Sequence, residues 1–163
     1  MVRSQPHSYD VRPAMRKTIL LADDDASVRT MIGRVLESEH YRVLLASTGR
    51  EAASQFLNGP PDLVLLDLNM PERDGWEAWH IMGTLHPFVR VIVITARPNQ
   101  YDHAQKMRID ALMEKPLDLP LLLQTINHLI VEPDEERIRR ITDRNFRTAL
   151  LNPLNRPEDS KGP

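Results

Sequence analysis

Short apolar segments alternate with longer amphipathic segments between residues 18 and 131. The apolar runs are short, and most lack the polar–apolar alternation of a strand with one solvent-exposed face. They therefore predict strands that are buried on both faces, as in a parallel sheet. These runs lie at Thr18–Ala22, Arg42–Leu45, Leu63–Leu66, Val91–Ile94 and Ala111–Met113.

The segments between these runs have the spacing of amphipathic helices. Apolar residues at i, i+3, i+4, i+7 and i+8 form one stripe along a helix, which we expect to face the core. Asp118 is placed to cap the last helix. The two clearest stripes are Val28, Met31, Ile32, Val35 and Leu36, and Leu119, Leu122, Leu123, Ile126 and Leu129. Three further helices are expected at Gly49–Leu57, Gly75–Leu85 and Asn99–Met107, the last with few apolar residues.

Five strands alternating with five helices predict βαβ units, which pack as a parallel sheet with helices on both faces. The alternation defines a central α/β domain at residues 17–131. Residues 1–16 are expected to form a flexible, solvated arm. In residues 132–163 we expect one helix at Glu136–Leu151, then a disordered tail, because three prolines follow Asn152.

The composition narrows the classes of protein that the chain can belong to. A length of 163 residues suits one domain with short extensions, and 41% hydrophobic with 27% charged residues is a globular balance. The absence of cysteine excludes disulfides, thiol catalysis and cysteine-ligated zinc. No apolar stretch approaches the roughly 20 residues of a membrane span. The first residues lack the apolar core of a signal peptide, so we expect a cytoplasmic protein.

Polar residues follow four of the predicted strands at the point where each strand ends. Asp23, Asp24 and Asp25 follow the first strand, Asp67 the third, Thr95 the fourth and Lys115 the fifth. The carboxyl ends of parallel strands meet at one edge of the sheet, where ligands bind in such folds. Carboxylates packed closely repel one another unless a cation joins them. Mg²⁺ suits this role, because it prefers oxygen ligands and binds carboxylates together with phosphate oxygens.

This combination of groups suits phosphoryl transfer. Lys115 supplies a positive charge and Thr95 a hydroxyl donor, and both can neutralise phosphoryl oxygens. Asp67 would be the nucleophile and would form an aspartyl phosphate. Each group alone also has an ordinary structural explanation. The Asp run can cap a helix, Thr95 can be a strand former, and Lys115 can be a solvated charge, so the interpretation depends on their joint arrangement.

Four segments of the sequence together resemble the receiver domains of two-component response regulators. They are Ile19–Asp25, Leu65–Pro71 followed by Asp74-Gly75, Ile94–Ala96 and Glu114–Leu117, and the resemblance covers about residues 17 to 131. It implies a flavodoxin-like fold, with a five-stranded sheet in the order 2-1-3-4-5. It also implies that Asp67 is the phosphoacceptor.

The same resemblance assigns roles to the other polar residues. Asp23 and Asp24 would be the acidic pair, with Asp24 as the expected direct Mg²⁺ ligand beside Asp67. Asn69 would offer its backbone carbonyl to the metal ion. Thr95 and Lys115 would hold the phosphoryl group. The Lys115–Pro116 peptide bond is expected to be cis.

Two positions depart from the family pattern. Leu112 lies three residues before the lysine, where receivers often carry an aromatic side chain. Arg108-Ile109 replaces the usual Gly-Ala before the last strand. We therefore expect the phosphorylation chemistry to be preserved and the surface around Asn99–Met107 and Ala111–Met113 to be altered.

The sequence favours a phosphorylatable receiver that is not an enzyme with a separate catalytic domain. A sensor histidine kinase or a phosphotransfer protein would supply the phosphoryl group, and an unidentified downstream protein would read the result. The sequence leaves a homodimer open. One alternative is a DNA-binding regulator that uses the C-terminal helix, in which Arg137, Arg140, Arg144 and Arg147 fall near one face. A solvated helix that extends from the domain or packs on it is favoured over a nucleic-acid contact. The other alternative is a receiver-like scaffold that takes no phosphate.

Overall fold

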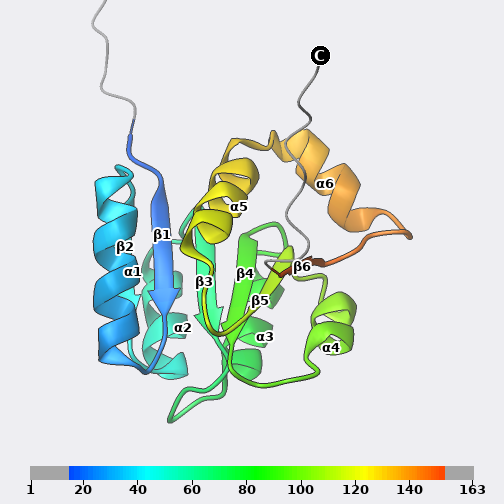
Figure 1. The fold of residues 1–163 in the computed structure, drawn as a ribbon. Helices are drawn as coiled ribbons and strands as arrows, with labels where there is room; N and C mark the ends of the chain where they lie inside the picture. The colour runs from blue at the N-terminus through cyan, green and yellow to red at the C-terminus, as the bar shows by residue number, and fades with distance from the viewer. Residues whose placement is uncertain (1–14, 153–163) are drawn as a thin grey trace, which may run out of the picture.

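The strands form one parallel sheet in the order β2-β1-β3-β4-β5-β6 in the computed structural model, which describes residues 15–152 (Figure 1). The bounds are β1 Thr18–Ala22, β2 Arg42–Ala46, β3 Leu63–Asp67, β4 Arg90–Thr95, β5 Ala111–Glu114 and β6 Ala149–Leu151. The predicted flavodoxin-like fold and the order of its five strands are confirmed. The sequence did not predict β6, which extends the sheet beyond β5.

Helices cover both faces of the sheet. They are α1 Ala26–Ser38, α2 Gly49–Asn58, α3 Gly75–Leu85, α4 Tyr101–Lys106, α5 Leu119–Val131 and α6 Asp134–Thr142. Apolar side chains of α2, α3 and α4 pack on one face of the sheet, and those of α1 and α5 pack on the other. The strands in the centre are consequently buried on both faces, as their apolar runs predicted. None of these helices, in the part of the chain that is described, has the length and hydropathy that a bilayer crossing needs.

Side-chain caps fix where several helices begin. Asp25 accepts hydrogen bonds from the backbone N–H groups of Ser27 and Val28 at the start of α1. Asp118 accepts one from the N–H of Leu121, which confirms its predicted role. These caps satisfy N–H groups that have no partner within the helix. The start of α1 is thereby fixed directly after the end of β1.

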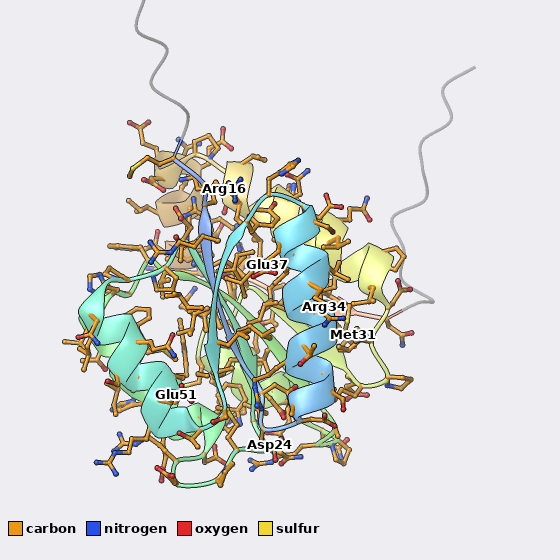
Figure 2. The ribbon with its side chains drawn as sticks, turned by 90° about the vertical axis from the view of Figure 1, so that its left-hand side faces the viewer. Arg16, Asp24, Met31, Arg34, Glu37 and Glu51 are labelled. Carbon is orange, nitrogen blue, oxygen red and sulfur yellow. The ribbon has the colours of Figure 1, made fainter. Side chains whose placement is uncertain are left out.

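The apolar stripe of α1 is only partly buried. Ile32 and Leu36 are buried against the sheet, whereas Met31 is 43% exposed and lies on the outer surface of the helix (Figure 2). Neighbouring residues in a helix point about 100° apart. A helix that touches the sheet along the line of Ile32 and Leu36 therefore turns Met31 toward solvent, and the predicted stripe was too wide.

The C-terminal extension differs most from its prediction. The helix α6 ends at Thr142, and residues 149–151 form a strand, so the predicted helix through Leu151 is wrong. Buried Phe146 and Thr148 lie between the two elements, which shows that this segment packs on the domain. The open edge of β5 offers unpaired backbone groups, and pairing with them stabilises an extended conformation there. The predicted arm up to residue 14 and the predicted tail from residue 153 lie outside the described residues.

Candidate functional site

Four strand ends bring the predicted polar residues to one edge of the sheet. Asp23 directly follows β1, Asp67 and Thr95 are the last residues of β3 and β4, and Lys115 directly follows β5. Parallel registers align these ends, since Asp67 pairs with Ile94 and the backbone N–H of Lys115 donates to the carbonyl of Thr95 at 2.8 Å. The structure therefore places these residues at one edge, as the positions of the strands predicted.

Lys115 lies between two buried carboxylates. Its Nζ is 2.7 Å from Oδ2 of Asp23 and 3.3 Å from Oδ2 of Asp67. Burial lowers the pKa of the Lys115 ammonium, but the hydrogen bond with Asp23 and the negative charges of Asp67 and Asp23 outweigh it and raise the pKa. Lys115 is consequently charged, and its shorter contact is to Asp23 rather than to Asp67.

Asp67 occupies an environment that opposes its negative charge. The residue is 1% exposed, and this burial is the largest cause of the raised pKa of its carboxyl group. The hydrogen bond from the N–H of Asn69, at 3.1 Å, favours the ionised form, while the charge of Asp23 disfavours it. A second cation beside Lys115 would relieve this repulsion between carboxylates.

Three carboxylates at this edge are close enough to share a metal ion. One oxygen each from Asp23, Asp24 and Asp67 lie within 4.8 Å of one another, and within residues 15–152 no other group of acidic or histidine residues has this arrangement. Asp23 and Asp67 are buried, whereas Asp24 is exposed at the lower end of α1 in Figure 2. An all-oxygen set with one solvent-facing member fits Mg²⁺, which binds through one or two carboxylates and keeps several waters.

Arg97 is part of the site and was not anticipated from the sequence. Its backbone N–H donates to Oγ1 of Thr95 at 3.0 Å, and its guanidinium forms an ion pair with Asp74 at 2.6 Å. Its Nε also donates to the side-chain carbonyl of Asn69. Arg97 thereby joins the loop after β4 to the loop after β3. The signal available in the sequence was its place two residues after Thr95.

Gly75 allows the loop after β3 to fold back against Asp67. A Cβ atom at this position would lie 2.3 Å from the backbone carbonyl oxygen of Asp67, which is too close for any side chain. The N–H of Gly75 donates to the carbonyl of Leu68 at 3.2 Å, and Asp74 caps α3 through the N–H of Trp76. The Asp74-Gly75 pair is therefore required by the backbone around the phosphoacceptor candidate.

Two further expectations from the sequence concern the Lys115–Pro116 peptide bond and the backbone carbonyl of Asn69. The Lys115–Pro116 peptide bond is cis, as the resemblance implied. Trp79 is buried in the core, and the ring of Trp76 lies against that of His103 with ring centroids 4.4 Å apart, so both tryptophans contribute to packing. The metal contact of the Asn69 carbonyl stays a prediction.

Both departures from the family pattern lie against the C-terminal extension. Leu112 is fully buried and pairs with Leu150 of β6. Arg108 has a φ of 53°, in the left-handed region that favours glycine. Its guanidinium donates to the backbone carbonyls of Ile141 and Asp143 at 2.7 and 2.9 Å. The C-terminal extension therefore covers the surface around α4 and β5.

Of the four arginines expected near one helix face, Arg137 and Arg140 lie on α6, whereas Arg144 and Arg147 lie beyond its end at Thr142 and are exposed. Arg137 is 2% exposed and forms an ion pair with Asp110, and Arg140 binds Glu132 and Asp110. These two guanidinium groups are paired with carboxylates of the same chain. The helix packs on the domain, which was one of the two arrangements expected for it.

Comparisons with known proteins point to one family. The family model described as the response regulator receiver domain matches residues 19–127. Response regulator RR06 of Streptococcus pneumoniae is 34% identical over 114 residues, which cover 69% of this chain and 52% of that protein. The transcriptional regulatory protein GlrR of Escherichia coli is 30% identical over 135 residues, which cover 82% of this chain and 29% of that protein. The chain thus spans about half or less of the length of these relatives.

Solved structures share the fold. A CheY-like receiver domain protein of Methanospirillum hungatei is 26% identical with a TM-score of 0.68, and the match covers 76% of this chain and 98% of that one. The response regulator protein TrrA of Thermotoga maritima, solved in complex with Mg²⁺-BeF, is 27% identical with a TM-score of 0.64. That match covers 69% of this chain and 98% of TrrA.

Proposed function

The chain belongs to the family of response regulator receiver domains, and on that premise we propose that Asp67 accepts a phosphoryl group in a two-component phosphorelay. One observation carries this proposal. Asp67 is buried at the carboxyl edge of the sheet, with Lys115 at 3.3 Å and two further carboxylates within 4.8 Å. The proposed role is that of a switch, and not that of an enzyme with a separate catalytic domain.

The proposed reaction is an in-line transfer. One oxygen of the Asp67 carboxylate forms a bond to phosphorus while the bond between phosphorus and the donor atom breaks, and the donor keeps the electron pair. The donor atom is a ring nitrogen in a phosphohistidine or an oxygen in acetyl phosphate. Because Asp23 makes the shorter hydrogen bond to Lys115, the Asp67 carboxylate is the less firmly held of the two and is available for attack.

Asp23, Asp24 and Asp67 would hold Mg²⁺, and the match between their spacing and an all-oxygen site supports this. When bound, Mg²⁺ supplies positive charge to the phosphoryl oxygens and to the crowded carboxylates. The burial of Asp23 and Asp67 keeps their charges poorly screened by water, which increases the demand for a cation.

Lys115 and Thr95 would stabilise the phosphoryl group once it is bound. The Lys115 ammonium already lies within reach of Asp67 and carries a positive charge. The hydroxyl oxygen of Thr95 accepts from the N–H of Arg97, so its proton remains free to donate to a phosphoryl oxygen. Donors fixed in place before the reaction stabilise developing charge without further reorganisation.

Phosphorylation would act as a switch because it changes the charge of a buried site. A phosphoryl group adds roughly −1.5 to −2 charges, by analogy with phosphorylated hydroxyls, and it accepts several hydrogen bonds. Conformations that provide these donors become favoured, which shifts the population of states. A sensor histidine kinase or a phosphotransfer protein would be the upstream partner, and a downstream protein would bind the changed surface.

The test compares two isosteric substitutions in the purified chain. Acetyl phosphate with Mg²⁺ should add one phosphoryl group to the wild type, detected by intact mass, and Asp67→Asn should remove this labelling. Asp25→Asn is the matched control, because the Asp25 side chain caps α1 and asparagine also caps helices. Undiminished labelling of Asp67→Asn, or an unlabelled wild type, would overturn the proposal.

A further inference from the structure

The end of the described chain lies along α4 and β5 as a short strap, which we define as residues 147–151. Within it, β6 pairs in parallel with β5 through the registers Ala111 to Ala149, Leu112 to Leu150 and Met113 to Leu151. The N–H of Ala149 donates to the carbonyl of Asp110 at 2.9 Å. In Figure 1 the strap runs from α6 across the outer edge of β5.

Two side chains of α4 hold the strap through its backbone. The hydroxyl of Tyr101 donates to the carbonyl of Thr148 at 3.1 Å. The side-chain amide of Gln105 accepts from the N–H of Thr148 at 2.7 Å and donates to the carbonyl of Phe146. These contacts depend on the position of α4 and not on the sequence of the strap.

The strap is attached more weakly than the helix that precedes it. Buried Arg137 anchors α6 through Asp110 and the carbonyls of Phe88 and Val89, at 2.5 to 3.0 Å. The strap has no such ion pair among the described residues, and Ala149 and Leu150 are exposed. The hydroxyl of Thr148 is buried without a hydrogen-bond partner, which makes this packed position less favourable.

A short path connects the strap to the phosphoacceptor site. Residues 96–100 join Thr95, at the end of β4, to Tyr101, the first residue of α4. The hydroxyl of Thr95 holds this loop by accepting from the N–H of Arg97. Within α4 only Ala104 is buried, and Tyr101 packs on the core from the start of the helix. A displacement of Thr95 or Arg97 would therefore move the start of α4, where Tyr101 lies.

We propose that the strap is bound to α4 and β5 in the unphosphorylated protein and is released when Asp67 is phosphorylated, while α6 stays anchored. This inference rests on the proposed phosphorylation of Asp67. A phosphoryl oxygen that recruits the Thr95 hydroxyl pulls on the loop to α4 and breaks the hydrogen bonds of Tyr101 and Gln105. Coupling is reciprocal, so loss of the strap contacts must also favour phosphorylation.

Hydrogen exchange of the full chain tests the release directly. The backbone amides of Thr148 and Ala149 are hydrogen-bonded in the resting state, so a peptide covering them should exchange slowly. Adding Mg²⁺ and beryllium fluoride, a phosphoryl mimic, should accelerate this exchange about 5-fold or more, the lower end of ordinary coupling. Peptides from α6 should keep their rate, because Arg137 remains paired.

Two substitutions in α4 test the contacts themselves. Tyr101→Phe and Gln105→Ala remove the hydrogen bonds to the strap and should accelerate exchange of Thr148 and Ala149 without any mimic. Because coupling is reciprocal for binding free energies, both variants should also bind beryllium fluoride with Mg²⁺ more tightly than the wild type. Tyr41→Phe and Gln124→Ala are matched controls away from the strap, and both should behave as the wild type.

The outcomes separate this inference from the proposed function. If Asp67 is labelled and the exchange of the strap stays unchanged, the release is refuted while the phosphorylation stands. Accelerated exchange of α6 together with the strap would also refute it, because the whole extension would then detach. If the wild type is neither labelled nor altered by beryllium fluoride, the proposed function fails, and the inference fails with it.

Discussion

Arg137 of α6 and Asp110, the residue before β5, form a buried ion pair through two hydrogen bonds. Nη1 of Arg137 is 2.5 Å from Oδ1 of Asp110, and Nη2 is 3.0 Å from Oδ2. Both side chains are buried, and Asp110 also accepts from the N–H of Val91 and from Arg140. One carboxylate thereby joins the C-terminal extension to the starts of β4 and β5.

Removing one partner of this pair should destabilise the protein strongly. Asp110→Ala leaves the buried guanidinium of Arg137 without its carboxylate, and breaking such pairs costs about 3–5 kcal/mol. Urea unfolding followed by tryptophan fluorescence measures the change. Arg139→Ala, an exposed arginine of the same helix, should change the free energy of unfolding by less than about 0.5 kcal/mol. Equal effects of the two substitutions would show that the pair has no special role.

Lys115→Met should slow phosphorylation while the fold is retained. The substitution removes the ammonium 3.3 Å from Asp67, and losing one fixed donor to developing charge slows catalysis on the order of 100-fold. The rate of mass increase with acetyl phosphate and Mg²⁺ gives the comparison. Lys106→Met, at an exposed lysine of α4, is the control and should be labelled at the wild-type rate. A normal rate for Lys115→Met would exclude the proposed role of the ammonium.

Gly75→Ala should damage both stability and phosphorylation. The added methyl group would lie 2.3 Å from the carbonyl oxygen of Asp67, so the backbone of the loop must move, at a cost of about 1–3 kcal/mol. Gly33→Ala in α1 is a matched control, because its Cβ would lie 3.5 Å from a side-chain carbon of Leu45. It should be neutral or stabilise by up to about 1 kcal/mol through helix propensity. Thermal unfolding and acetyl phosphate labelling of both variants provide the measurement. Equal stability and equal labelling of the two variants would contradict the prediction.

The stability of the extension should depend on pH through Glu132. Hydrogen bonds from Arg140, at 2.6 and 2.8 Å, are the largest cause of the lowered pKa of this carboxyl group. A lowered folded-state pKa adds stability above the unfolded pKa of about 4.3, and this stability is lost as the pH falls through the folded value.

Glu132→Gln should therefore lose less stability than the wild type when the pH is lowered from about 6 to about 3. Urea unfolding at several pH values provides the measurement, with Glu135→Gln, at an exposed position of α6, as the control. Identical pH profiles for the wild type and Glu132→Gln would contradict the expectation.

The central domain could be predicted because the apolar pattern of its strands and the rules for connecting parallel strands lead to the same fold. Four of the five apolar runs are followed by polar residues at the sheet edge, and right-handed βαβ connections leave few ways to arrange such strands. The bounds of α3 were predicted as they stand, and α2 extends one residue beyond its prediction. The helix α4 is shorter than predicted, running from Tyr101 to Lys106, and Ala104 is its single buried residue.

The sequence by itself determined the parallel sheet and the meeting of Asp23, Asp67, Thr95 and Lys115, because strand ends fix the positions of the residues that follow them. Only the tertiary structure decided which helix and strand residues 132–152 form. Three residues of β6 carry too little pattern to predict a strand, and they become one because the edge of β5 supplies hydrogen-bond partners. Arg137 could not be recognised as a buried residue from the sequence, since its partner Asp110 lies 27 residues away along the chain and becomes its neighbour only on folding.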